Sequence, residues 1–188
     1  MKVIFFLFVI VFVKIDARVF VGKCRKIPAP VVEHFEFKNY MGVWYEILWY
    51  DDEYETFDEC LQFTYEDTST CDSEKTFKTQ LKLQSPTDNY EEQQKYYGVG
   101  KQFDGGKLGT GTIYPTAPNY FVLATDYCNY SFVWDCFNVN ATHYNERMWY
   151  FDRQPNPSSI PRKVQSLISK HFDKRYVRKT YHGDKCRY

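Results

Sequence analysis

The sequence predicts an all-β fold: an eight-stranded up-and-down antiparallel barrel with one C-terminal α-helix packed outside it. From residue 41 onward, short runs of alternating hydrophobicity are separated by turn residues at intervals of roughly ten, which is typical of all-β barrels and sandwiches. Aromatic residues, which favour strands, are abundant, with 17 Tyr, 16 Phe and 4 Trp. We favour a barrel over a sandwich because closure removes edge strands.

The predicted elements follow from these alternating runs. The expected strands are 43–50, 61–66, 76–84, 93–103, 107–114, 120–126, 130–137 and 147–153. Ser158-Ser159-Ile160-Pro161 then predicts a helix start, with a serine N-cap and an early proline. Apolar residues recur at helical spacing after it, and we expect this stripe to pack on the barrel. The stripe consists of Val164, Leu167, Ile168 and Phe172.

The first residues predict a secretory signal peptide. Lys2 precedes the apolar run 3–13, and Ala17 precedes the expected cleavage site. A membrane-spanning helix needs roughly 20 apolar residues, so we expect no integral membrane segment. The sequence is therefore divided into a signal peptide, residues 1–17, and one secreted domain, residues 18–188.

Charge and cysteine content narrow the function further. The formal net charge is zero, which does not favour nucleic-acid binding. An even number of cysteines in a secreted chain predicts three disulfides, although spacing alone leaves 15 pairings open. No closely spaced pair of the kind that zinc sites use is present, so no metal is expected. The cysteines are Cys24, Cys60, Cys71, Cys128, Cys136 and Cys186.

Two N-glycosylation sequons are present. They begin at Asn129, in Asn129-Tyr130-Ser131, and at Asn140, in Asn140-Ala141-Thr142, whereas Pro157 excludes Asn156. We expect both asparagines on surface turns and the protein to be a glycoprotein.

Three motifs in order resemble the lipocalin family. Gly42-Val43-Trp44-Tyr45 resembles the first motif, Thr125-Asp126-Tyr127 the second, and Arg153 the third. Within the family, the resemblance is strongest to apolipoprotein D and the insect bilin-binding proteins or insecticyanins. This similarity implies that Trp44 closes the base of the barrel and that Arg153 lies over it.

The resemblance also implies two disulfides, Cys24–Cys136 and Cys60–Cys186. Cys71 and Cys128 depart from the family pattern. Cys71 follows the second predicted strand and Cys128 the sixth, and in an up-and-down barrel both turns lie at the closed end. We therefore predict a third disulfide between them, with a free thiol or an intermolecular bond as the alternatives.

Strand alternation predicts which side chains face the interior. If Trp44 points inward, so do Glu46 and Leu48, and if Arg153 lies over Trp44, then Phe151 and Trp149 point inward. Trp44 and Arg153 are expected to fill the base. The residues expected to contact a ligand are Glu46, Leu48, Phe63, Tyr65, Tyr120, Val122, Trp134, Trp149 and Phe151. Ala124 is expected to face the interior too.

We therefore expect a secreted carrier of a small hydrophobic ligand. The resemblance favours a non-covalently bound bilin, biliverdin, and no cofactor is required. The alternatives are sterols, fatty acids or retinoid-like lipids as in apolipoprotein D, or an interaction protein. Such a protein would scavenge small mediators or bind a partner protein through its open-end loops, for which the acidic loop 50–59 is a candidate surface. Association into a homo-oligomer is left open.

An enzyme is not expected. Some lipocalins use a free cysteine in the barrel, but no cysteine here falls at an inward position in the middle of a predicted strand. The histidines lie in predicted loops, helix or tail, and neither a catalytic triad nor a phosphate-binding loop is recognisable. The histidines are His34, His143, His171 and His182.

Overall fold

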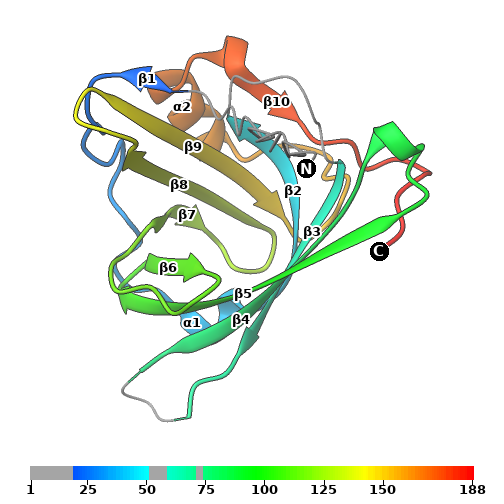
Figure 1. The fold of residues 1–188 in the computed structure, drawn as a ribbon, viewed down its shortest axis with the longest axis horizontal. Coiled ribbons are helices and arrows are strands. Elements are labelled where there is room, and N and C mark those ends of the chain that lie inside the picture. Colours follow the sequence, from blue (N-terminus) through cyan, green and yellow to red (C-terminus); the bar gives the residue numbers. More distant parts are fainter. Residues whose placement is uncertain (1–18, 51–58, 71–73) are drawn as a thin grey trace, which may run out of the picture.

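Eight antiparallel strands form a closed barrel (Figure 1). The computed structural model describes residues 19–50, 59–70 and 74–188. Each strand pairs with the next, and β9 returns to pair with β2. The strands are β2 (Gly42–Tyr50), β3 (Glu59–Asp67), β4 (Thr76–Gln84), β5 (Gln93–Asp104), β6 (Lys107–Gly111), β7 (Tyr120–Thr125), β8 (Tyr130–Asn138) and β9 (His143–Asp152). The predicted barrel is confirmed, with each strand close to its expected position. The predicted signal peptide and nearly all of the acidic loop lie outside the described residues.

The helices and strands outside the eight barrel strands are short. They are β1 (Phe20–Val21), α1 (Phe37–Tyr40), η1 (Pro86–Asp88), α2 (Arg162–His171), η2 (Lys174–Tyr176) and β10 (Val177–Lys179). β1 extends the sheet beside β9, and β10 pairs with the upper part of β2. In the described parts of the chain, no helix combines the length and the apolar character needed to cross a membrane.

The C-terminal helix α2 packs outside the barrel as predicted, but the expected serine cap is wrong. Pro161 occupies the N-cap position and no side chain caps the helix. Because the helix starts only at Arg162, Ser158 and Ser159 lie too far upstream to reach its first free amides. Val164, Ile168 and the following Phe172 are buried against the barrel.

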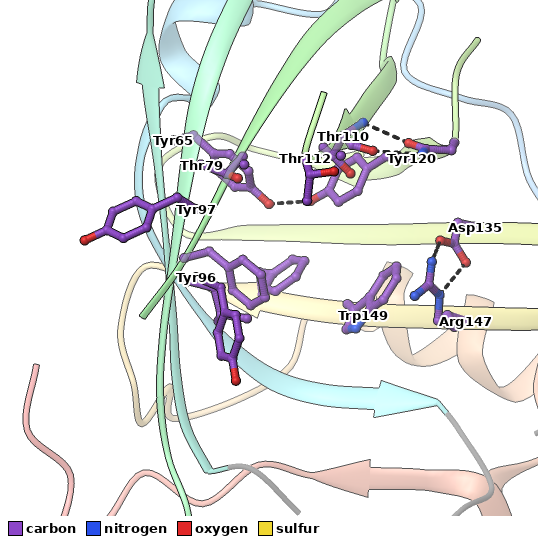
Figure 2. Close-up of a pocket in the computed structure, with 16 residues that line it drawn as sticks. Tyr65, Thr79, Tyr96, Tyr97, Thr110, Thr112, Tyr120, Asp135, Arg147 and Trp149 are labelled. Atoms are coloured by element: carbon purple, nitrogen blue, oxygen red, sulfur yellow. Dashed lines mark hydrogen bonds and ion pairs between the residues drawn. The ribbon is translucent and has the colours of Figure 1, made fainter. Parts of the chain in front are cut away.

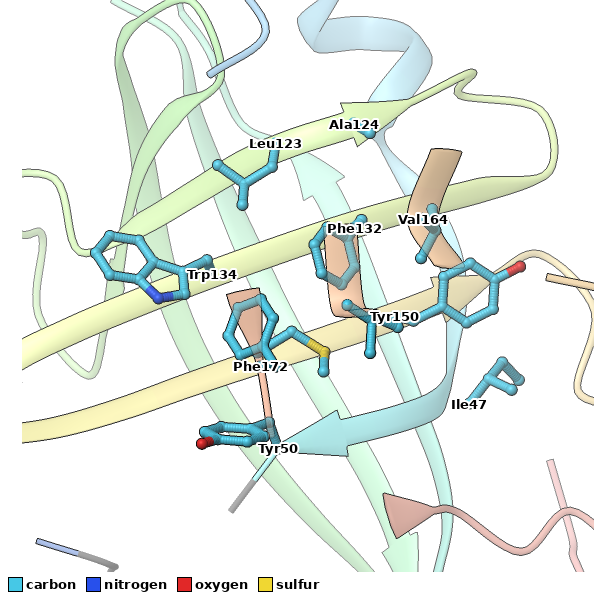
Figure 3. Close-up of a cluster of buried hydrophobic side chains, with 11 residues drawn as sticks. Ile47, Tyr50, Leu123, Ala124, Phe132, Trp134, Tyr150, Val164 and Phe172 are labelled. Atoms are coloured by element: carbon cyan, nitrogen blue, oxygen red, sulfur yellow. The ribbon is translucent and has the colours of Figure 1, made fainter. Parts of the chain in front are cut away.

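Two apolar clusters occupy opposite faces of the barrel wall. The outer cluster lies between the wall and α2 (Figure 3) and comprises Ile47, Tyr50, Leu123, Ala124, Phe132, Trp134, Met148, Tyr150, Val164, Ile168 and Phe172. The inner cluster fills the lower interior and comprises Phe37, Tyr40, Trp44, Tyr65, Phe77, Leu108, Tyr120, Val122, Val133 and Phe151. The barrel is thus stabilised from both sides of the same strands.

Irregularities in two strands change which residues face the interior. In β2 the register with β9 shifts between Glu46 and Leu48, and in β7 the register with β8 shifts between Val122 and Ala124. Such a bulge inserts one residue, so the alternation of faces reverses beyond it. Leu48 and Ala124, both predicted to point inward, therefore pack with the outer cluster.

A second constraint acts on β5, where glycine allows a close approach of neighbouring side chains and backbone. A Cβ atom at Gly100 would lie 2.3 Å from the ring of Phe77 and 2.6 Å from the carbonyl oxygen of Gly109. Only glycine allows these two approaches.

Two disulfides attach the ends of the chain to the barrel. Cys24 is bonded to Cys136 and Cys60 to Cys186, so both predicted pairings are confirmed. Cys128 is exposed and is bonded to no cysteine among the described residues. Cys71 lies outside the described residues, so that pairing stays a prediction.

Replacing Cys60 and Cys186 together with serine should lower the free energy of unfolding by about 4–5 kcal/mol in the chain-entropy model, because the bond spans 126 residues. Urea unfolding followed by tryptophan fluorescence measures this. The comparison variant Cys128→Ser should change stability by less than about 0.5 kcal/mol if its thiol is free, and this also tests the predicted bond to Cys71. A loss of several kcal/mol in this variant would instead indicate that Cys128 is bonded.

The C-terminal tail is anchored by a buried histidine. Nε2 of His182 donates to the carbonyl of Glu46 at 2.6 Å, and Nδ1 accepts from the hydroxyl of Tyr188. Nearby, the hydroxyl of Thr180 donates to the Glu46 carboxylate at 2.9 Å. Burial is the main cause that lowers the pKa of His182, with Lys179 adding to the effect. The folded tail therefore holds the neutral imidazole.

This anchor predicts acid sensitivity. Because the folded-state pKa of His182 is below the unfolded value of about 6.5, the unfolded state binds the proton first, and stability falls as pH drops through that range. His182→Gln retains a donor for Glu46 without titrating. Its unfolding free energy should depend less on pH between 7 and 5 than that of the wild type, in urea titrations at each pH. Parallel profiles would contradict the role of His182.

Candidate ligand-binding site

The closed end of the barrel is held by Arg153, which follows β9. Its guanidinium carbon lies 3.5 Å from the centroid of the Trp44 ring. The guanidinium donates to backbone carbonyls of the segment 39–43, and its Nε donates to the carbonyl of Tyr127 at 3.0 Å. Trp44 donates to the carbonyl of Tyr40 at 2.8 Å. All three motifs thus meet here, and the predicted stack of Arg153 on Trp44 is confirmed.

Above this base, four hydroxyl groups form a buried chain. The hydroxyl of Tyr40 lies 2.9 Å from that of Ser131 and 2.9 Å from that of Tyr120, which lies 3.3 Å from that of Tyr65. Burial raises the pKa of Tyr40 to about 12 and raises the pKa of Tyr65 and of Tyr120 as well. All three phenols are therefore neutral at physiological pH.

A cavity of about 360 Å³ opens above the tyrosines (Figure 2). Ligand pockets for small molecules typically measure about 300–1,000 Å³ and are mainly apolar and aromatic with a few polar groups. The rings of Trp149 and Tyr120 are stacked, with their centroids 6.4 Å apart. The lining residues are Phe63, Tyr65, Thr79, Leu81, Tyr96, Tyr97, Gly98, Thr110, Gly111, Thr112, Asn119, Tyr120, Asp135, Arg147, Trp149 and Phe151.

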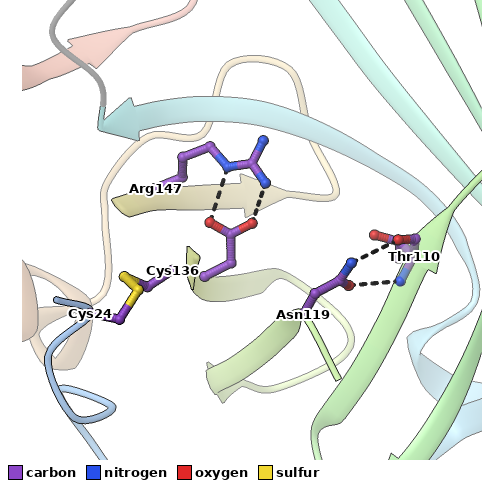
Figure 4. Close-up of polar contacts among 6 residues, drawn as sticks. Cys24, Thr110, Asn119, Cys136 and Arg147 are labelled. Atoms are coloured by element: carbon purple, nitrogen blue, oxygen red, sulfur yellow. Dashed lines mark hydrogen bonds and ion pairs between the residues drawn. A yellow bond between two sulfur atoms is a disulfide. The ribbon is translucent and has the colours of Figure 1, made fainter. Parts of the chain in front are cut away.

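Two polar pairs occupy one wall of the cavity (Figure 4). Arg147 binds both carboxylate oxygens of Asp135, with Nε at 3.0 Å from one of them. Burial is the main cause that raises the pKa of Asp135, and Arg147 opposes it. The amide of Asn119 both donates to and accepts from the backbone of Thr110 at 2.9 Å, which continues the pairing of β6 beyond its two pairs with β7. The polar wall is thus internally satisfied.

Five of the nine predicted contact residues line this cavity: Phe63, Tyr65, Tyr120, Trp149 and Phe151. Two others, Glu46 and Val122, are buried but do not line it. Glu46 instead accepts the hydrogen bond from Thr180, and Val122 belongs to the inner cluster. Whether the five residues contact a ligand stays a prediction.

The other two predicted contacts, Leu48 and Trp134, are placed on the wrong face. Leu48 is turned outward by the bulge in β2 and packs with the outer cluster. Trp134 also belongs to the outer cluster, and its Nε1 donates to the buried Glu146 at 2.6 Å. No anchored residue defined the alternation of β8 in the sequence. The neighbouring Asp135 takes the inward position.

Sequence reasoning missed Arg147 and Asp135, although a signal for Arg147 exists. Arg147 precedes Trp149 by two residues, so the alternation that places Trp149 inward applies to Arg147 too. Asp135 is its direct cross-strand partner in β8. The tyrosines of β5, Tyr96 and Tyr97, were also missed, and both are largely exposed.

The two sequons lie on exposed turns, as expected. Nδ2 of Asn129 donates to Asp126 at 2.8 Å. The Asn140 side chain accepts from the backbone and hydroxyl of Thr142 at 2.9 and 3.1 Å, which uses the oxygen of its amide and not the nitrogen that carries a glycan. Glycosylation of Asn129 and Asn140 stays a prediction.

Comparison with known proteins agrees with this geometry, although no protein-family model matches the sequence. Apolipoprotein D from Cavia porcellus is 30% identical over 134 residues, covering 70% of this chain and 67% of the relative. Apolipoprotein D from Mus musculus is 30% identical over 162 residues, covering 81% and 78%. Among solved structures, insecticyanin from Manduca sexta matches with a TM-score of 0.63 at 16% identity, covering 92% and 93%.

The barrel with its closed base and apolar cavity defines a carrier protein of the calyx type. The chain belongs to the lipocalin family and is similar to apolipoprotein D. The relatives in these comparisons are binding proteins and not enzymes, and the fold and cavity support the same coarse role for this chain, a carrier of small hydrophobic ligands.

Losing the hydrogen bonds of the Arg153 guanidinium should lower the free energy of unfolding. Arg153→Lys keeps a positive charge near Trp44 but cannot bond the same set of carbonyls. We expect a loss of about 2–3 kcal/mol in unfolding free energy, since hydrogen bonds to charged groups contribute about 1.5–3 kcal/mol. Urea unfolding provides the measurement. The same change at Arg175, which pairs with Asp173 on the surface, should cost under about 1 kcal/mol. Equal losses in the two variants would show that the guanidinium hydrogen bonds of Arg153 are not required for stability.

Proposed function

We propose that this protein is a secreted lipocalin that carries a small hydrophobic ligand, biliverdin first among the candidates, in the cavity above the tyrosines. The observation that carries the proposal is an aromatic cavity of about 360 Å³ inside a barrel closed at its base. Secretion is supported by the apolar N-terminal run and by the two disulfides, which are typical of oxidising compartments.

The size of the apolar contact is sufficient for useful affinity. A flat ligand that loses ~400 Å² of apolar surface gains on the order of 10 kcal/mol. Several kcal/mol of that gain are lost to immobilisation of the ligand. The remainder corresponds to roughly micromolar to nanomolar affinity without a covalent bond or a metal.

The choice of biliverdin rests on the resemblance to bilin-binding proteins. The apolar walls are equally compatible with sterols, fatty acids and retinoid-like lipids, which are the alternative ligands. A mediator-scavenging role would use the same cavity. Binding experiments with each candidate ligand distinguish among these alternatives.

Adding biliverdin to the purified protein should produce a saturable change in the visible absorbance of the pigment. Trp149→Phe should weaken this binding about fivefold, because it removes roughly 40 Å² of contact at ~25 cal/mol per Å². Trp134→Phe is the matched control, since Trp134 packs in the outer cluster, and its affinity should equal that of the wild type.

Each outcome bears on a different part of the proposal. An unchanged spectrum would reject biliverdin as the ligand. If a sterol, a fatty acid and a retinoid also failed to bind by calorimetry, the carrier function itself would be rejected. Equal weakening by the two tryptophan variants would place the ligand outside this cavity.

A further inference from the structure

The hydroxyl groups at the floor of the cavity carry one more proton than the hydrogen bonds among them use. Tyr65 and Tyr120 line the cavity, and Figure 2 shows their hydroxyls meeting there. Behind them, Tyr40 and Ser131 continue the chain and are fully buried. The four hydroxyls carry four protons, because each hydroxyl has one. Three contacts join them, so one proton is left without an acceptor inside the chain.

The position of the surplus proton follows from burial. If it were on Ser131 or Tyr40, a donor would be enclosed at 0% exposure with no further partner among the described residues. An unpaired buried donor costs about 1–3 kcal/mol. If the chain instead runs from Ser131 through Tyr40 and Tyr120 to Tyr65, the last proton points toward the cavity. The second arrangement is favoured, so the floor presents a donor to the ligand.

The charges around the cavity do not offer a site for an anion. Arg147 is the only cation among the described lining residues, and its Nε and Nη2 are both bonded to Asp135. Glu46 is buried in β2 next to the cavity-lining Phe151, and its charge adds to the burial that raises the pKa of Tyr65. A carboxylate at the floor would therefore lose its hydration without gaining a cation.

We propose that the cavity selects hydrophobic ligands whose inner end is an uncharged hydrogen-bond acceptor, such as an aldehyde, ketone or lactam carbonyl. The same skeleton ending in a hydroxyl accepts the surplus proton but adds one of its own, so one proton again lacks an acceptor, and a skeleton ending in a carboxylate brings an unpaired charge. This selection depends on the proposed function, because it assumes that the ligand occupies the cavity.

Three retinoids with one carbon skeleton test the selection directly: retinaldehyde, retinol and retinoic acid at pH 8. Affinities are measured by isothermal titration calorimetry with the full secreted chain. Retinaldehyde should bind about fivefold more tightly than retinol, the equivalent of one neutral hydrogen bond, and at least about tenfold more tightly than retinoate.

Variants locate the effect at the floor. In the double variant Tyr65→Phe/Tyr120→Phe, the preference for retinaldehyde over retinol should fall to less than about twofold while retinoid binding persists. The control is Tyr96→Phe, because Tyr96 lines the same cavity but its hydroxyl donates to Gln94. This control should keep the full preference.

Equal binding of the three retinoids by the wild type would overturn the selection and leave the carrier function intact. Tighter binding of retinol or retinoate would overturn it as well. If none of them bound, the proposed function would fail for this ligand class and the selection with it. The wild-type comparison decides the matter even if the double variant does not fold.

Discussion

The stack of Arg153 on Trp44 is the contact on which the rest of the molecule depends. It joins the end of β9 to the start of β2 through the guanidinium, which also bonds carbonyls of the α1 segment. These are the two strands whose pairing closes the barrel. With the base held shut, the interior is open only above it, and the tyrosine hydroxyls become the floor of a pocket.

The wall of the barrel has to satisfy two packing partners at once. Its outer face receives α2 through the outer cluster, and its inner face must leave room for a ligand. The bulges in β2 and β7 serve this division, because they turn Leu48 and Ala124 outward to α2. The cavity consequently has fewer apolar lining residues than strict alternation implies. The Asp135–Arg147 pair lines it in place of Trp134.

The predicted site was correct in β9, where the anchored Arg153 defines the alternation of a regular strand. Trp149 and Phe151 follow from Arg153 along β9, and no irregularity intervenes. The prediction failed beyond the bulge of β2, where a one-residue insertion has no recognisable signal in the sequence. It also failed in β8, where alternation offers two faces and the apolar side chain of Trp134 suits either one.

The sequence by itself determined the barrel, its strands and, through family resemblance, two disulfides. Periodicity and turn residues are local properties, and the motif residues Trp44 and Arg153 are diagnostic as a set. Only the tertiary structure decided the hydroxyl chain of Tyr40, Tyr65 and Tyr120, which come from one short helix and two distant strands. Hydrogen bonds between such residues depend on the arrangement of the strands in the closed barrel. No local sequence pattern predicts that arrangement.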